Sequence, residues 1–120
     1  MKQIELNQAL IKFAGLGMTK EVVKCLELGA DVHSWEDYAL RWAADDGYIE
    51  IVKLLLQAGA DVHARYDSAL RGAAENGRTE TVKLLLQNGA DIHAYKNETL
   101  RLAAQNGHTE TVNLLESYSK

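Results

Sequence analysis

The sequence predicts an all-α repeat solenoid made of four stacked helix–turn–helix units. One observation is a period of 30 residues: the motif Gly-Ala-Asp-Val/Ile-His occurs at residues 29–33, 59–63 and 89–93. A second observation is that a glycine recurs with the same period, as Gly17, Gly47, Gly77 and Gly107. Units of this length cannot bury an apolar face alone, so each must stack on its neighbours.

The composition excludes several classes of protein. The chain has 120 residues and a net charge of −4 at pH 7. A negative chain lacks the basic face that nucleic acids and anionic membranes require, so we expect neither as a partner. No apolar run approaches the ~18 residues of a membrane span, and the first ten residues contain no signal-peptide core. The single cysteine, Cys25, cannot form an internal disulfide, which favours a cytoplasmic setting.

The helices of each unit are predicted from their end signals. An Asn or Asp, whose side chain can accept hydrogen bonds from a helix N-terminus, precedes each first helix as Asn7, Asp37, Asp67 or Asn97. The predicted first helices are 8–16, 38–46, 68–76 and 98–106. Each of them ends at a glycine in the left-handed conformation. The predicted second helices carry an apolar face and are 19–28, 49–58, 79–88 and 109–118.

The first helices have one face that repeats and one that varies. Leu40, Ala43 and Ala44 share a small apolar face at helical spacing, which suits close packing. The varying face has Tyr38, Trp42 and Asp45 in one unit, Ser68, Gly72 and Glu75 in the next, and Glu98, Leu102 and Gln105 in the last. A recognition surface on a shared scaffold would show this pattern, and so would unconstrained surface drift.

The repeats resemble the ankyrin repeat over residues 7–118. The run from Ala39 to His63 is similar to that family's consensus: Thr-Pro-Leu-His-x-Ala-Ala, then Gly-His, Val-x-x-Leu-Leu and Gly-Ala-Asp-Val-Asn. The family's period is about 33, so we expect residues to be missing at the hairpin tip, which would be shortened to a plain loop. The resemblance implies a single domain, 1–120, of four ankyrin-type repeats at about 7–36, 37–66, 67–96 and 97–120.

Two origins are compatible with this resemblance. The sequence is similar to the ankyrin arrays of giant viruses and some microbes, and a viral protein of this kind would act in the host cytoplasm. The segments 79–82 and 109–112 are both Thr-Glu-Thr-Val, which is also expected of a designed consensus sequence.

The repeated histidines are the most conspicuous candidates for chemistry. His33, His63 and His93 recur at one position, but packed helices lie ~8–10 Å apart, whereas zinc ligands lie ~2.0–2.1 Å from one ion. We therefore expect no metal site. By the resemblance, each histidine replaces the family's hairpin asparagine and would hydrogen-bond loop backbone. Asparaginyl hydroxylases act at this position when a leucine lies eight residues upstream, as Leu55 and Leu85 do, so His63 and His93 are candidate modification sites.

No arrangement of residues predicts catalysis or a cofactor. Cys25 aligns with core leucines, so we expect a buried, inert thiol. Asp45 and Asp46 point ~100° apart on a helix and cannot act as an acid/base pair. Arg41 and Asp45 are expected to form an i,i+4 ion pair, as are the equivalent residues of the next unit. There is no Ser/His/Asp set and no glycine-rich phosphate loop.

The aromatic and arginine side chains of the central units predict a protein-binding surface, because such residues are enriched at interface hot spots. We expect a monomeric, non-enzymatic interaction module that holds a protein partner across the concave first-helix face and the short loops. The alternatives are a partnerless structural or designed scaffold and, for Trp42, a ring that merely covers the next repeat's helix. The predicted contact residues are Trp35, Tyr38, Trp42, Asp45, Arg65, Tyr66, Glu75, Tyr95, Leu102 and Gln105.

Overall fold

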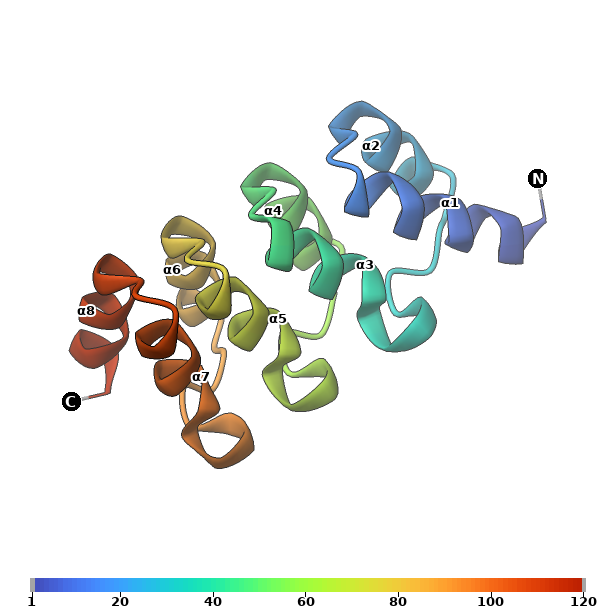
Figure 1. Ribbon diagram of the computed structural model, residues 1–120. Coiled ribbons are helices and arrows are strands. Elements are labelled where there is room, and N and C mark those ends of the chain that lie inside the picture. Colours follow the sequence, from blue (N-terminus) through green and yellow to red (C-terminus); the bar gives the residue numbers. More distant parts are fainter. Residues whose placement is uncertain (1, 120) are drawn as a thin grey trace.

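The computed structural model describes residues 2–119 and contains eight α-helices in four successive pairs (Figure 1). The helices are α1 Gln3–Gly15, α2 Thr19–Glu27, α3 Ser34–Asp46, α4 Ile49–Gln57, α5 Ala64–Glu75, α6 Thr79–Gln87, α7 Ala94–Gln105 and α8 Thr109–Tyr118. Residues 2–119 contain no strand. The predicted all-α repeat solenoid is therefore confirmed.

The helix pairs stack into an elongated molecule of 46 × 21 × 20 Å. Helices α1, α3, α5 and α7 pack against one another in one row, and α2, α4, α6 and α8 form a second row beside it. Figure 1 shows the pairs following one another from the N-terminal to the C-terminal end of the stack. Each pair contacts its immediate neighbours, as the repeat period requires.

One apolar core runs along the whole stack between the two rows. Ala43, Ala44, Ala73 and Ala74 are fully buried, and their small side chains allow α3 and α5 to approach their neighbours closely. Leu55 and Leu85 fill the core from the second row and are likewise inaccessible. Within residues 2–119, none of the helices has both the length and the apolar character needed to cross a membrane.

The ends of the helices were predicted with mixed success. The left-handed glycines after the first helices are confirmed, with φ of 69–74° at Gly17, Gly47, Gly77 and Gly107. The second helices begin at the predicted residues. The predicted start of the N-terminal helix was wrong, because α1 begins at Gln3 and Asn7 lies inside it. In α3, α5 and α7 the right-handed helical backbone begins at residues 38, 68 and 98, as predicted. Before the other first helices the chain makes a turn that the sequence did not indicate.

That turn is a short left-handed helical segment at the start of α3, α5 and α7. Residues 35–37, 65–67 and 95–97 all have φ between 52° and 60°, although none is glycine. We call these segments the left-handed turns, and they project from the same side of the stack (Figure 1). They stand where the sequence predicted a plain loop. Left-handed backbone costs about 1–2 kcal/mol per L-residue, so side chains must hold each turn in place.

Candidate functional site

The left-handed turns are closed first by backbone hydrogen bonds. The amide N–H of the last turn residue donates to the carbonyl oxygen of the histidine before the turn. This N···O distance is 3.1 Å for Asp37 and Asp67 and 3.2 Å for Asn97. Each turn is therefore a loop closed by its own backbone.

The first two turns are held by arginines from the right-handed part of the same helix. In α3, the Nε and Nη2 atoms of Arg41 donate to the carbonyl oxygens of Glu36 and Trp35, each at 3.0 Å. Arg71 holds the two equivalent carbonyls of the second turn at 2.9 Å. The predicted Arg41–Asp45 ion pair is wrong, because the guanidinium group turns toward the loop. The equivalent prediction for Arg71 fails for the same reason.

The aspartate that ends a turn also ties two repeats together. Asp37 is buried, and its two carboxylate oxygens lie 3.1 Å from Nδ1 of His33. Its Oδ2 accepts the amide N–H of Asp61 in the next repeat at 2.7 Å. Asp67 makes the same contacts one repeat later, at the same distances. The pKa of His33 is raised, first because its ring N–H donates a hydrogen bond to the Asp37 carboxylate and then because that carboxylate is negatively charged.

These contacts correct two predictions. The carboxylate of Asp37 bonds to the next repeat and was predicted to cap its own helix. The ring of His33 bonds to a carboxylate, whereas the resemblance implied a bond to loop backbone. In both cases the residue type was suited to a polar contact. Asp37 bonds across 24 residues to the next repeat, and His33 meets Asp37 across the left-handed turn, which the sequence did not indicate.

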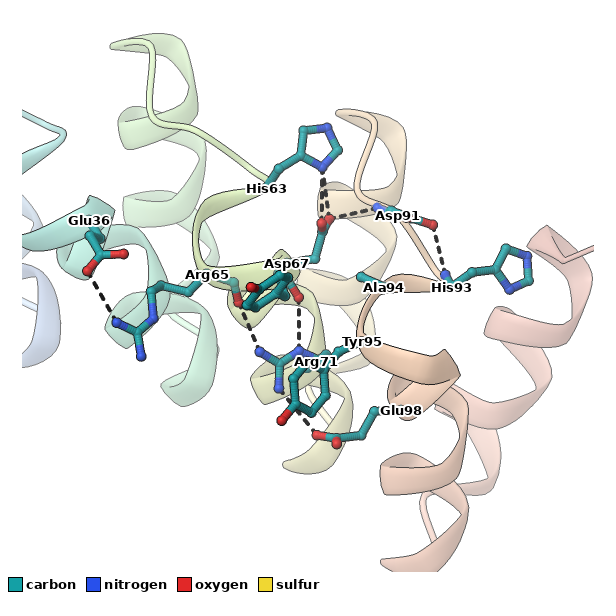
Figure 2. A pocket seen from close by; sticks show the side chains of 11 residues that line it. Glu36, His63, Arg65, Asp67, Arg71, Asp91, His93, Ala94, Tyr95 and Glu98 are labelled. Carbon is teal, nitrogen blue, oxygen red and sulfur yellow. Dashed lines mark hydrogen bonds and ion pairs between the residues drawn. The ribbon is translucent and has the colours of Figure 1, made fainter.

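A groove with a volume of about 1250 Å³ lies beside the second and third left-handed turns (Figure 2). We call it the turn groove. It brings together three of the predicted contact residues, Arg65, Tyr66 and Tyr95, with both predicted modification sites. Its lining comprises Glu36, His63, Arg65, Tyr66, Asp67, Arg71, Asp91, His93, Ala94, Tyr95 and Glu98.

The aromatic rings of the left-handed turns are exposed. The Tyr66 and Tyr95 rings lie side by side across two repeats, with centroids 5.7 Å apart and planes tilted by 47°. Tyr66 is 70% exposed and Tyr95 is 51% exposed. Trp35, on the first turn, is 66% exposed. Three successive turns therefore present aromatic side chains to solvent on a fixed backbone.

Five charged residues of the groove were not predicted as site residues, and three of them, Glu36, Arg71 and Glu98, form ion pairs. Arg71 pairs with Glu98 at 3.2 Å, and both side chains are 18% exposed. Arg71 also lies over the Tyr95 ring, 4.8 Å from its centroid. Glu36 pairs with Arg65 at 3.2 Å near the groove's edge, where both side chains are exposed. The only sequence signal for these pairs was that an acidic residue at position 98 follows the repeated arginine by roughly one period.

The aromatic residues of α3 form a stack that is partly closed. The Trp35 and Tyr38 ring centroids lie 6.4 Å apart, and those of Tyr38 and Trp42 lie 5.7 Å apart, with nearly parallel planes. Tyr38 and Trp42 are only half-exposed. The indole of Trp42 lies directly over Gly15 of α1, where no Cβ could be accommodated. Trp42 therefore covers the helix of the preceding repeat, not the next one.

The remaining predicted residues lie apart from the turn groove. Asp45 is half-buried against Gly72 of α5. Burial, then the charges of Asp46 and Glu75, raise the pKa of Asp45 to about 6. Leu102 is half-buried on α7, and Glu75 is exposed.

Gln105 is likewise exposed, at the C-terminal end of α7. The predicted surface thus divides into exposed turns and a partly closed helix face.

The repeated histidines remain accessible. The side chain of His63 is 56% exposed, even though its Nδ1 contacts Asp67. His93 is exposed as well, with Nδ1 2.7 Å from Oδ1 of Asn97. Within residues 2–119, no three His, Cys, Asp or Glu side chains are placed to hold one metal ion. Modification of His63 and His93 stays a prediction.

The sequence also matches a family model. A family model described as ankyrin repeats (3 copies) matches residues 40–120. The match begins within α3 and includes every residue that lines the turn groove except Glu36. No curated protein is similar enough to this chain in sequence to be matched with it.

Proposed function

The chain belongs to the ankyrin repeat family, and we propose that it is a non-enzymatic protein-interaction module that holds its partner on the left-handed turns. Proteins of this family generally bind other proteins. The turn groove and the exposed rings around it form the proposed contact surface. The inner-helix residues Trp42 and Asp45 contribute less in this proposal than the sequence predicted, because neighbouring helices already cover part of each.

One observation carries this proposal: within residues 2–119, nine residues that are not glycine adopt left-handed backbone, and all nine lie in the three turns. Such strain persists only where the surrounding structure fixes it, and it concentrates at functional sites. Here Arg41 and Arg71 fix two of the turns. Rigid aromatic side chains lose little entropy on binding, so turns of this kind suit a contact surface.

The proposal is tested by an alanine scan against a binding protein. The binder would be selected from a displayed library of protein fragments, using the folded chain as bait. We expect Tyr66→Ala to weaken binding by ~2 kcal/mol or more, as hot-spot truncation does. Matched substitutions on the opposite side of the stack, Lys53→Ala and Gln87→Ala, should leave the affinity unchanged. Losses confined to Lys53 and Gln87 would show that the contact surface is on the second-helix side.

A second candidate function is a partnerless scaffold, natural or designed, and one sequence observation favours it. Thr-Glu-Thr-Val occurs identically at residues 79–82 and 109–112, as selection or design for stability alone would produce. The two functions differ in what they require of the turns. A scaffold tolerates alanine at all exposed turn positions in every assay, whereas an interaction module loses its binder.

Further proposals concern the organisation of the chain and its setting. We propose that residues 1–120 act as one monomeric domain with repeats at about 7–36, 37–66, 67–96 and 97–120. A cytoplasmic setting fits Cys25, which is buried and whose thiol pKa is raised by burial and then by Glu21. Hydroxylation of His63 or His93 would be detected by mass spectrometry of the protein from its native source.

A further inference from the structure

We propose that the turn groove binds an extended peptide segment of the partner and seats an arginine or lysine side chain of that segment on the Tyr66 ring. This inference rests on the proposed function and specifies the chemistry of the partner. Three features of the groove support it: the balance of charge, the way in which its own arginines are already used, and the one tyrosine ring that they leave open.

The charge of the groove favours a cation. Its lining contains four carboxylates, on Glu36, Asp67, Asp91 and Glu98, and two guanidinium groups, on Arg65 and Arg71. The groove therefore has a net negative charge, and the whole chain, at −4, has the same sign. Potentials of one sign in a concave surface attract ligands of the other sign.

An anionic ligand would find few free donors in the groove. The Nε and both terminal nitrogens of Arg71 already donate, to two turn carbonyls and to Glu98. Arg65 faces Glu36 at 3.2 Å in a solvent-exposed pair. Exposed pairs of this kind are weak, so a partner cation can take over the Glu36 carboxylate. The carboxylate of Asp91 is exposed and pairs with no cation among residues 2–119.

The tyrosines indicate where the cation sits. The chain stacks its own arginines on two of its tyrosine rings: Arg41 lies 4.9 Å from the Tyr38 centroid, and Arg71 lies 4.8 Å from the Tyr95 centroid. Within residues 2–119, no cation lies over Tyr66, which is the most exposed large hydrophobic side chain described, at 70%. A cation over an aromatic face is attracted by the ring quadrupole. Tyr66 is thus an open position of a kind that the chain fills elsewhere.

The dimensions of the groove set the length of the segment. Its lining extends from Glu36 on α3 through α5 to Tyr95 and Glu98 on α7, which are two repeat steps (Figure 2). Packed helices lie about 8–10 Å apart, so the groove is roughly 16–20 Å long. An extended chain advances about 3.3 Å per residue. Five or six residues therefore span it, with the cation near the middle.

The test uses synthetic heptapeptide pools that are random except at the central residue. One pool has arginine there, a second lysine, a third glutamate and a fourth leucine. Each is immobilised and probed with the fluorescently labelled chain, and affinities of the best peptides follow from fluorescence anisotropy. We expect the arginine and lysine pools to retain the chain and the other two to do so at least about tenfold less. Raising the salt concentration should weaken the retention.

Two variants and two matched controls locate the binding. Tyr66→Ala and Glu36→Gln should each weaken the best cationic peptide, by about tenfold for the tyrosine. The controls are Tyr118→Ala, another exposed tyrosine, and Glu50→Gln, whose exposed carboxylate pairs with Lys53 on α4. Both controls should bind like the unchanged protein. Circular dichroism of each variant shows whether the helices are retained.

The possible outcomes separate this inference from the proposed function. Preference for the glutamate or leucine pool, with losses still at Tyr66, would overturn the cationic segment and leave the interaction module standing. Equal losses in Glu50→Gln would show general charge attraction and overturn the groove as the site. Displacement of the peptide by spermidine at equal concentration would likewise show that charge alone is recognised. Binding that maps to Lys53 and Gln87 would overturn both proposals.

Discussion

The inner face of α3, by which we mean Trp42 and Asp45, and the left-handed turn 65–67 were predicted as contact surfaces on the same grounds. In the structure they differ. Trp42 lies against Gly15 of the preceding repeat and Asp45 against Gly72 of the following one, whereas the Tyr66 ring is mostly exposed. A variable residue in a stacked array must therefore be judged by the residue that the neighbouring repeat presents to it.

The two glycines explain why the inner face is closed. Gly15 occupies the repeat position of Asp45, and Gly72 occupies the repeat position of Trp42. Both sites lie where neighbouring first helices face each other, and each glycine makes room for one larger side chain of α3. The variation between repeats at these positions is therefore partly compensation between neighbours. It is not recognition alone, and it is not free drift.

The largest difference in stability between the inner face and the turn is expected when the aromatic ring of each is removed. Trp42→Ala removes a half-buried indole that covers Gly15, so we expect the free energy of unfolding to fall by about 2–3 kcal/mol, less than for a fully buried aromatic. Tyr66→Ala removes an exposed ring and should change it by no more than ~0.5 kcal/mol. Urea unfolding followed by circular dichroism measures both. Equal effects would mean that the inner face is as open as the turn.

A smaller effect is expected from filling the two glycine sites. In Gly15→Ala the new methyl group meets the rigid indole of Trp42, and overpacking of this kind costs about 1–3 kcal/mol. In Gly72→Ala it meets the end of the flexible Asp45 side chain. That side chain can rotate away, and alanine favours the helix by up to ~1 kcal/mol, so we expect little net change. If both variants lose stability equally, the two sites are equivalent.

Much of the fold could be predicted from the sequence, because the period and the glycines determine it. Gly47 and Gly77 end their helices as predicted, and Leu55 and Leu85 lie in the core. The contacts of the site could not be predicted in the same way. Arg71 reaches Glu98 across 27 residues, a pairing set by how repeats stack. Periodicity gives the face on which a side chain lies but not the neighbour that meets it.

The left-handed turns are the other feature that the sequence did not indicate. Left-handed backbone is normally signalled by glycine, and the turns contain Trp35, Arg65 and Tyr95, which give no such signal. Their conformation depends on side chains from elsewhere, such as the arginines that bind the turn carbonyls. Local propensity was therefore overridden by side-chain contacts. Some lie within one repeat, such as those of the arginines, and others join two repeats, such as that of Asp37 with the Asp61 amide.

Lys96→Gly tests this conformation directly. Lys96 has a φ of 58°, is exposed, and its side chain makes no hydrogen bond or ion pair within residues 2–119. Glycine removes a left-handed strain of about 1–2 kcal/mol and loses about 0.5–1 kcal/mol in entropy. We expect a net gain near 1 kcal/mol in thermal or urea unfolding, with Lys96→Ala as the control that should show no gain. A loss of stability would contradict the left-handed turn.

The smallest predicted effect concerns Asp45, and its sign follows from its pKa. Burial and the neighbouring charges of Asp46 and Glu75 raise that pKa from 3.8 to about 6. Between these values the folded state holds a proton that the unfolded state has lost. The contribution of Asp45 to stability is therefore fully present below pH 3.8 and is lost as the pH rises through 6.

Asp45→Asn removes this titration, because an amide stays neutral. The substitution breaks no side-chain hydrogen bond, since within residues 2–119 only the backbone carbonyl of Asp45 accepts bonds from other side chains. The variant and the unchanged protein should be equally stable near pH 3.5. Above pH 6.5 the variant should be more stable by about 0.5 kcal/mol, a small value because solvent screens a half-exposed carboxylate. Urea unfolding in half-unit steps from pH 3.5 to 8 measures the difference. If the difference in unfolding free energy between the two proteins does not depend on pH, the carboxylate of Asp45 is as freely solvated as a side chain on the turns. The contrast between the closed face and the open turns would then fail at this residue.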